Sequence, residues 1–167
     1  MSTAPDDVRF CMACGAAMST ERVAGVDRRV CGGCGRVHYV DPKVAVGVAV
    51  FRDDELLLVR RVMEPGRGQW ALPAGFVDAG EDPRVTAARE VREEAGVEVE
   101  VEAVTEVFRN PPEHGGSLFI LYAARWLAGE PVAGDDADAA GFFPRDALPP
   151  MIFASTAHAV AYWPVRR

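Results

Sequence analysis

Long hydrophobic runs are missing from this sequence of 167 residues. The longest apolar run without a charge is VAVGVAVF, at Val44–Phe51. It is far shorter than the roughly 20 residues that a membrane-spanning helix needs. The N-terminus reads MSTAPDDVRF, which is polar and acidic and lacks the basic start and apolar stretch of a secretory signal. We therefore expect a cytoplasmic protein with no membrane partner.

Positively charged residues are fewer than negatively charged ones. Lys and Arg number 18 against 25 Asp and Glu, so the formal net charge is −7. Because such a surface repels the phosphates of a nucleic acid, we do not expect broad electrostatic binding to DNA or RNA. The stretch GDDADAAG, at Gly134–Gly141, reads as an exposed acidic loop. The length is enough for one domain with a proper core, plus a small satellite.

Cysteine is absent after residue 34, and all four cysteines form two pairs, CMAC (Cys11, Cys14) and CGGC (Cys31, Cys34). Their C-x2-C-x16-C-x2-C spacing is typical of a zinc ribbon. Each pair offers two thiolates from one tight turn, and two pairs complete a tetrahedron that leaves zinc no open position. We therefore predict a structural Zn²⁺ site. Two disulfides are the alternative, which is less favoured in a chain without a secretion signal.

The rest of the chain mixes strands with few helices. A helix is expected to be capped by Asp82, to begin at Pro83 and to end at Gly96. Strong apolar or alternating patterns predict strands and a second helix. The strands are expected over 43–52, 56–62, 97–108, 117–127 and 140–144, with short extended pieces over 70–82, and the helix over 155–163. This order favours a three-layer α/β/α sandwich.

Three glutamates, Glu90, Glu93 and Glu94, crowd the end of the first predicted helix. Like charges at i,i+4 destabilise a helix by about 0.2–0.5 kcal/mol per pair, and anions near its C-terminus cost roughly 0.3–1 kcal/mol each. At about 100° per residue the glutamates share one face. The apolar arc on the opposing side contains Val85, Ala88, Val91 and Ala95. A divalent cation would reverse the penalty, since Mg²⁺ favours carboxylates and phosphates; a solvated acidic face is the alternative.

The run GFVDAGEDPRVTAAREVREEAGV, at Gly75–Val97, matches G-x5-E-x7-R-E-U-x-E-E-x-G-U, where U is aliphatic. This is the signature of the Nudix hydrolase family, which the chain resembles from about residue 43 to 163. The cysteine segment resembles the zinc-ribbon subset of that family, which includes NADH pyrophosphatases. We therefore expect a tail over 1–9, a zinc ribbon over 10–40, a Nudix domain over 41–163 and a tail over 164–167.

The resemblance implies an α/β/α sandwich with a mixed sheet. It also implies Mg²⁺- or Mn²⁺-dependent hydrolysis of a nucleoside diphosphate linked to another group, such as ADP-ribose, FAD or NADH. A nucleoside monophosphate would be released. Removal of an NAD cap from RNA and non-enzymatic ligand sensing are the alternatives. The ribbon would also suit a homodimer, which is common among the relatives.

The resemblance assigns roles to single residues of the signature. Glu90 and Glu94 would bind the catalytic metal, and Glu93 would bind the metal or a water next to it and is the best candidate for the general base. Arg89 would orient the glutamates through ion pairs, with Glu81 among its partners. The carbonyl of Ala74 would supply a further oxygen ligand. Gly75 would permit close backbone approach at the substrate site.

Residues outside the signature are candidates for substrate contacts. Arg60 and Arg61 either meet phosphate or form an exposed strand end. Phe108 and Arg109 follow the strand where related enzymes often read the nucleoside.

The chain departs from the family pattern at two places. The segment EVFRNPP at 106–112 replaces a motif of the NADH pyrophosphatases, which weakens the case for NADH. An acidic residue expected near the last strand is replaced by Ala139, and Asp138 or Asp136 are the candidate substitutes.

Overall fold

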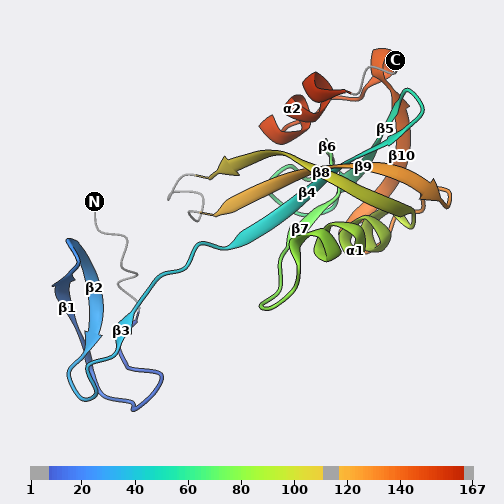
Figure 1. The fold of residues 1–167 in the computed structure, drawn as a ribbon. Helices are drawn as coiled ribbons and strands as arrows, with labels where there is room; N and C mark the ends of the chain where they lie inside the picture. The colour runs from blue at the N-terminus through green and yellow to red at the C-terminus, as the bar shows by residue number, and fades with distance from the viewer. Residues whose placement is uncertain (1–7, 111–116, 164–167) are drawn as a thin grey trace. The chain divides into compact units, whose positions relative to one another are not determined.

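The computed structural model describes residues 8–110 and 117–163. The chain divides into two compact units, Met1–Pro42 and Lys43–Arg167, called here the ribbon unit and the sheet unit (Figure 1). The predicted tail over 164–167, and residues 1–7 of the tail predicted over 1–9, lie outside the described residues.

The ribbon unit is a small antiparallel sheet in the order β1-β2-β3. Its strands are β1 (Met18–Val23), β2 (Val26–Cys31) and β3 (Val37–His38). The apolar core of this unit consists of Cys11, Met18 and Cys31, against which Val8 and Ala16 pack. So small a core does not normally hold a fold together without a metal or a covalent cross-link.

The sheet unit is built on one mixed sheet in the order β10-β5-β4-β9-β8. Two short strands extend it, because β6 pairs with β5 and β7 pairs with β4. The central pair β4–β9 is parallel, and the other pairs are antiparallel. The strands are β4 (Val44–Arg52), β5 (Glu55–Arg61), β6 (Trp70–Ala71), β7 (Ala74–Phe76), β8 (Glu98–Arg109), β9 (Leu118–Ala128) and β10 (Ala137–Pro144).

Two helices cover opposite faces of this sheet, α1 (Pro83–Ala95) and α2 (Ala154–Tyr162) (Figure 1). Alternate residues of β4 explain the three layers. Val46, Val48 and Val50 share a buried cluster with residues of α1, whereas Ala49 and Phe51 share one with Ala159 of α2. The predicted α/β/α sandwich with a mixed sheet is thereby confirmed.

The signals at both ends of α1 act as predicted. Asp82 is the N-cap, and its side chain accepts a hydrogen bond of 2.8 Å from the Arg84 N–H. Pro83 is the first helical residue, and Gly96 ends the helix in the left-handed region at φ 68°. Neither α1 nor α2, the two α-helices of the described residues, is long and apolar enough to cross a membrane.

The burial of α1 differs from the predicted apolar arc. Val85 is 59% exposed, whereas Glu94 is only 8% exposed. The buried residues are Thr86, Ala87, Val91, Glu94 and Ala95. The prediction was therefore wrong at Val85, because the helix is rotated about its axis so that Glu94, and not Val85, is buried against the sheet. The hydrophobic period alone does not predict which face of the helix is buried when small and polar residues share that face.

Candidate functional site

The four cysteines lie together in the ribbon unit. The Sγ atoms of Cys11 and Cys34 are 3.7 Å apart, and those of Cys14 and Cys31 are 3.4 Å apart. These distances are too long for disulfides. Four sulfurs at about 2.3 Å from a zinc ion form a tetrahedron with edges of about 3.8 Å. The cluster, in which all four sulfurs lie within 4.8 Å of one another, therefore fits Zn²⁺.

Each cysteine pair is held by a tight turn. Gly15 N–H donates to the Cys11 carbonyl at 2.9 Å, and Gly35 N–H donates to the Cys31 carbonyl at 3.0 Å. Both glycines have positive φ, 73° and 72°, a conformation that other residues rarely adopt. Cys34 N–H also donates to the Cys31 Sγ at 3.4 Å, and this bond is the main reason why the pKa of Cys31 falls to about 6. At Cys31 the thiolate, the form that binds zinc, is therefore favoured at neutral pH.

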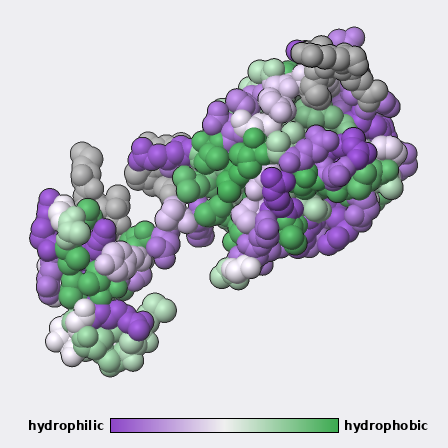
Figure 2. Space-filling model, in the orientation of Figure 1, coloured by the Kyte–Doolittle hydropathy of each residue, from purple (hydrophilic) through white to green (hydrophobic). Residues whose placement is uncertain are grey.

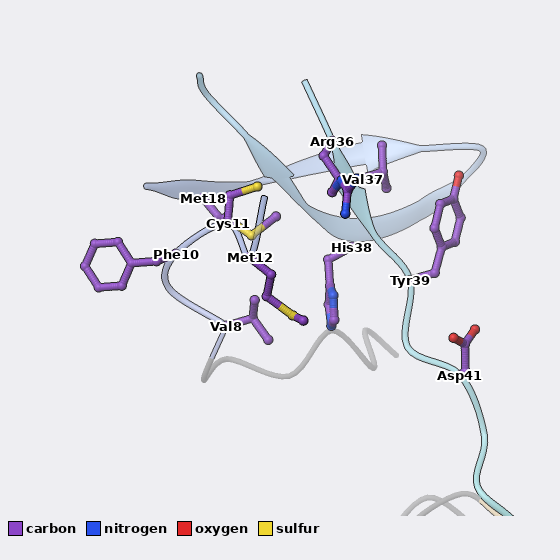
Figure 3. Close-up of a pocket in the computed structure, with 10 residues that line it drawn as sticks. All are labelled: Val8, Phe10, Cys11, Met12, Met18, Arg36, Val37, His38, Tyr39 and Asp41. Atoms are coloured by element: carbon purple, nitrogen blue, oxygen red, sulfur yellow. The ribbon is translucent and has the colours of Figure 1, made fainter. Parts of the chain in front are cut away.

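A cavity of about 240 Å³ lies beside this cluster (Figure 3). Phe10, Met12 and His38 are among the side chains that line it. Phe10 and Met12 are 66% and 91% exposed, and hydrophobic surface is visible on the ribbon unit (Figure 2). The cavity belongs to the ribbon unit and contains none of the predicted catalytic residues.

Arg89 organises the glutamates at the end of α1. Its Nε lies 3.1 Å from the Glu81 carboxylate, and its Nη1 lies 2.8 Å from both Glu90 Oε1 and Glu93 Oε2. The expected ion pair between Arg89 and Glu81 is thus present, and Arg89 also pairs with Glu90 and Glu93. Hydrogen bonds from Arg89 hold the pKa of Glu81 at about 2. Arg89 therefore compensates much of the like-charge repulsion that the sequence places here.

Gly75 makes room for one of these carboxylates. A Cβ atom at this position would lie 2.1 Å from the carboxyl carbon of Glu90. Sequence reasoning linked Gly75 to close backbone approach at the substrate site. The structure shows that the side chain of Glu90 fills the space.

The backbone of Ala74 contacts one of the glutamates of α1. Its N–H donates to Glu94 Oε2 at 3.2 Å. The preceding carbonyl, of Pro73, accepts from Val48 N–H of β4 at 3.0 Å. In a strand, the N–H and C=O of one residue point to the same edge, and those of the next residue point to the opposite edge. Since the Pro73 carbonyl points toward β4, the Ala74 carbonyl points away from β4, as the Ala74 N–H does. A backbone oxygen is thus available beside the glutamates.

Burial changes the acidity of the site. The pKa of Glu94 is raised to about 7, chiefly by burial and further by the charge of Glu90, against the opposing effect of the Ala74 N–H. Burial also raises the pKa of Glu90. Glu93 is the most accessible of the three, with a side chain that is 38% exposed against 13% for Glu90.

These oxygens do not form a closed cage. Within the described ranges 8–110 and 117–163, the cysteines are the one group that brings three or more ligand atoms within 4.8 Å of one another. Glu90 and Glu93 are instead held by Arg89. Mg²⁺ commonly takes one or two protein carboxylates together with water and substrate phosphates. An open set of carboxylate and carbonyl oxygens therefore fits such a cation.

The two adjacent arginines of β5 have different surroundings. Arg60 Nε lies 2.6 Å from a carboxylate oxygen of Asp138 on β10. Arg61 lies over the ring of Phe153, at 5.5 Å from its centroid, and its charge lowers the pKa of Glu94. Val59, two residues earlier on β5, packs in the same cluster as residues of α1. Because alternate strand residues share a face, Arg61 is the arginine on the side of the glutamates.

Phe108 and Arg109 are at the far end of β8. The Phe108 ring packs against Phe119 and edge-on against His158, at centroid distances of 6.3 Å and 5.6 Å. It belongs to the cluster beneath α2, on the face opposite to the glutamates. Arg109 is exposed. The structure does not bring these two residues to the glutamate cluster.

One group of contacts was missed by sequence reasoning. Residues 132–134, which lead into the acidic loop predicted over Gly134–Gly141, touch the last turn of α1. No local sequence pattern predicts a contact between residues that are so far apart in the chain. Gly134 is the one sequence feature that could have indicated a close backbone contact here.

Comparisons with known proteins agree with this geometry. A family model described as the NUDIX domain matches residues 41–163, and a zinc-ribbon model described as Nudix N-terminal matches residues 9–40. The ADP-ribose pyrophosphatase of Methanocaldococcus jannaschii is 36% identical over 117 residues, which cover 69% of this chain and 69% of that protein. The NAD-capped RNA hydrolase of Pseudomonas aeruginosa is 37% identical over 145 residues.

The second relative covers both units, since its match spans 86% of this chain. This chain spans only 50% of the length of that protein. A solved structure of a NUDIX hydrolase from Nitrosomonas europaea superimposes with a TM-score of 0.77 at 32% identity, over 84% of this chain and 80% of the other. Signature, fold and these matches together show that the chain belongs to the Nudix family of hydrolases and carries the family's N-terminal zinc ribbon.

Proposed function

We propose that the protein hydrolyses the diphosphate bond of a nucleoside diphosphate linked to another group, using Mg²⁺ or Mn²⁺, and releases a nucleoside monophosphate. ADP-ribose and FAD represent the substrate class. The observation that carries the proposal is the position of Glu94, buried against the Ala74 backbone with Glu90 and Glu93 beside it. The similarity to an ADP-ribose pyrophosphatase supports the choice of substrate class.

The metal would be held by Glu90, Glu94 and the carbonyl of Ala74, with Glu93 at its edge. A bound Mg²⁺ or Mn²⁺ neutralises charge on a diphosphate and lowers the pKa of a bound water. Burial of Glu94 favours this use, because an ionised carboxylate in that position is costly without a cation. Zn²⁺, in contrast, would be a structural ion in the ribbon, where four thiolates leave it no open position.

Glu93 is the proposed general base. Its side chain is the most exposed of the three glutamates, so it can reach a water molecule in the open part of the site. As the water oxygen attacks one phosphorus, Glu93 accepts a proton, and the bond from that phosphorus to the bridging oxygen breaks. Arg89 keeps the carboxylate in place through its 2.8 Å contact.

Arg61 is the proposed phosphate contact. Two observations support this assignment: the charge of Arg61 lowers the pKa of Glu94, and its guanidinium lies over the Phe153 ring. The guanidinium of Arg60 is already paired with Asp138. We therefore assign phosphate binding to Arg61 and a structural ion pair to Arg60.

Asp136 is the better substitute for the acid that Ala139 lacks. Its charge acts on Glu94 and raises the pKa of that group. Asp138 is held by Arg60 at 2.6 Å. Asp136 would therefore add negative charge to the metal site, while Asp138 would not.

Removal of an NAD cap from RNA is the second candidate function. The match to an NAD-capped RNA hydrolase runs over both the ribbon and the sheet unit, which favours this reading. The net charge of −7 opposes tight binding of a long polyanion. NAD-capped RNA contains the same kind of diphosphate bond, so the two candidates share one site.

A substrate screen tests the proposal. ADP-ribose, FAD, NADH and an NAD-capped RNA would be incubated with Mg²⁺ and the protein, and the released nucleoside monophosphate measured by chromatography. The Glu98→Gln variant is the matched control, since Glu98 is an exposed glutamate at the start of β8. Release from ADP-ribose or FAD supports the main proposal, and release from the RNA alone supports the second. No release from any of them contradicts both.

Two further expectations stay predictions. A homodimer would be tested by sedimentation of the full chain. A cytoplasmic location would be tested by fractionation of the source cells.

A further inference from the structure

We infer that the 129–134 segment, between β9 and β10, positions Glu93 and Glu94, and that Gly134 is the positioning residue on which this depends. The inference rests on the proposed metal site, because it concerns how two of the proposed ligands are held. The 129–134 segment lies outside the Nudix signature of Gly75–Val97 and is distant from it in the chain.

The segment completes the end of α1. The last carbonyls of a helix lack partners within the helix, so a glutamate there sits on a turn that frays. Val132 N–H donates to the Ala95 carbonyl at 2.9 Å, and Gly134 N–H donates to the Glu94 carbonyl at 3.2 Å. Two of the carbonyls that the helix leaves open are therefore bonded by the 129–134 segment.

Gly134 allows the two backbones to come this close. A Cβ atom at position 134 would lie 2.4 Å from the Glu93 carbonyl oxygen. Gly134 is not among the glycines with positive φ, so its backbone conformation suits other residues. The glycine is therefore required by the approach to Glu93, and alanine would act through this contact alone.

The far side of the segment is tied to the sheet. The Asp136 carbonyl accepts from Val62 N–H at 3.0 Å, and Ala137 pairs with Arg61 of β5. Because the segment cannot retreat without breaking these bonds, a Cβ at position 134 would push on the helix end. Separating the atoms requires a movement of more than about 0.5 Å, which is the tolerance within which functional side chains must be held.

The expected consequence is local to the metal site. Glu93 and Glu94 are adjacent, so a displaced backbone moves both carboxylates. Glu90 lies one turn earlier, and its carboxylate occupies the space next to Gly75. Residues that orient metal ligands from outside typically change metal affinity by about 10–100-fold when they are altered. Substrate groups that do not touch the metal should be bound as before.

Gly134→Ala tests the inference, with Gly141→Ala as its matched control. A Cβ at Gly141 would meet only the Phe143 ring, at an ordinary 3.4 Å. Mn²⁺ binding to zinc-loaded protein would be measured by electron paramagnetic resonance without substrate. We expect at least about tenfold weaker Mn²⁺ binding in Gly134→Ala and wild-type binding in Gly141→Ala. With saturating Mg²⁺, kcat for the preferred substrate should fall while KM changes little.

Equal Mn²⁺ affinity in wild type and Gly134→Ala would overturn the inference and leave the proposed function standing. Failure of the wild type to bind Mn²⁺ would overturn both.

A second measurement on the wild type decides the case if Gly134→Ala does not fold. Since coupling between two sites is reciprocal, Mn²⁺ should slow hydrogen exchange at the amides of Val132 and Gly134. Unchanged exchange at these amides with Mn²⁺ bound would overturn the inference.

Discussion

Glu94→Gln should change how the stability of the sheet unit depends on pH. In the folded protein the pKa of Glu94 is raised from 4.5 to about 7, chiefly by burial. The native state therefore binds a proton more tightly than the unfolded chain does, and the stabilisation is fully present below pH 4.5. It is lost as the pH rises through about 7. The loss for the wild type amounts to about 3 kcal/mol.

Glutamine at this position is neutral at every pH and keeps an oxygen that can accept from the Ala74 N–H. The variant should therefore lack this pH dependence. Without divalent cations, wild type and Glu94→Gln should unfold with similar free energies near pH 4.5, and the variant should be more stable by about 3 kcal/mol at pH 8.

Urea denaturation between pH 4.5 and 8 would measure this difference. All three tryptophans, Trp70, Trp126 and Trp163, belong to the sheet unit, so their fluorescence reports on that unit alone. Excess Mg²⁺ should stabilise the wild type at pH 8 but not the variant, because ligand that binds the native state raises its stability. A stability difference that is the same at pH 4.5 and pH 8 would refute the reasoning.

Four other substitutions probe three separate parts of the account. Gly75→Ala puts a Cβ 2.1 Å from the Glu90 carboxyl carbon, so Mn²⁺ binding by electron paramagnetic resonance should weaken at least about tenfold; unchanged binding would argue against a role for Glu90 as ligand. Arg61→Ala should raise KM for ADP-ribose by roughly 10–100-fold, as expected for a lost charge-assisted bond, whereas Arg60→Ala should change it less than about twofold; equal effects would contradict the assignment. Cys14→Ser should lower the zinc content from near one ion per chain, measured by elemental analysis, and retained zinc would exclude the four-thiolate site.

The local features of the fold were predictable from the sequence. Asp82, Pro83 and Gly96 each act within a few residues of the helix end that they define, so their signals are readable in one window. The cysteine spacing is also local to each turn, and it led to the cluster that the structure shows. The apolar run over 43–52 likewise predicted a strand, which the structure shows as β4.

Features that depend on distant parts of the chain were not predictable in the same way. The rotation of α1 that exposes Val85 is set by the sheet beneath it, and the contact of Gly134 with Glu93 depends on where β9 ends. The separation of Arg60 from Arg61 is an intermediate case. Successive strand residues face opposite sides, so the period of two would have indicated that both arginines do not serve one site.

The most direct test of the account is hydrolysis by a Glu93→Gln/Glu94→Gln double variant, with Glu98→Gln as the control. Release of nucleoside monophosphate from the best substrate of the screen would be followed in saturating Mg²⁺. If these carboxylates hold the metal and the attacking water, the double variant should lose at least about a hundredfold in kcat while the control keeps wild-type activity. A double variant that keeps kcat within about tenfold of the wild type would contradict the account.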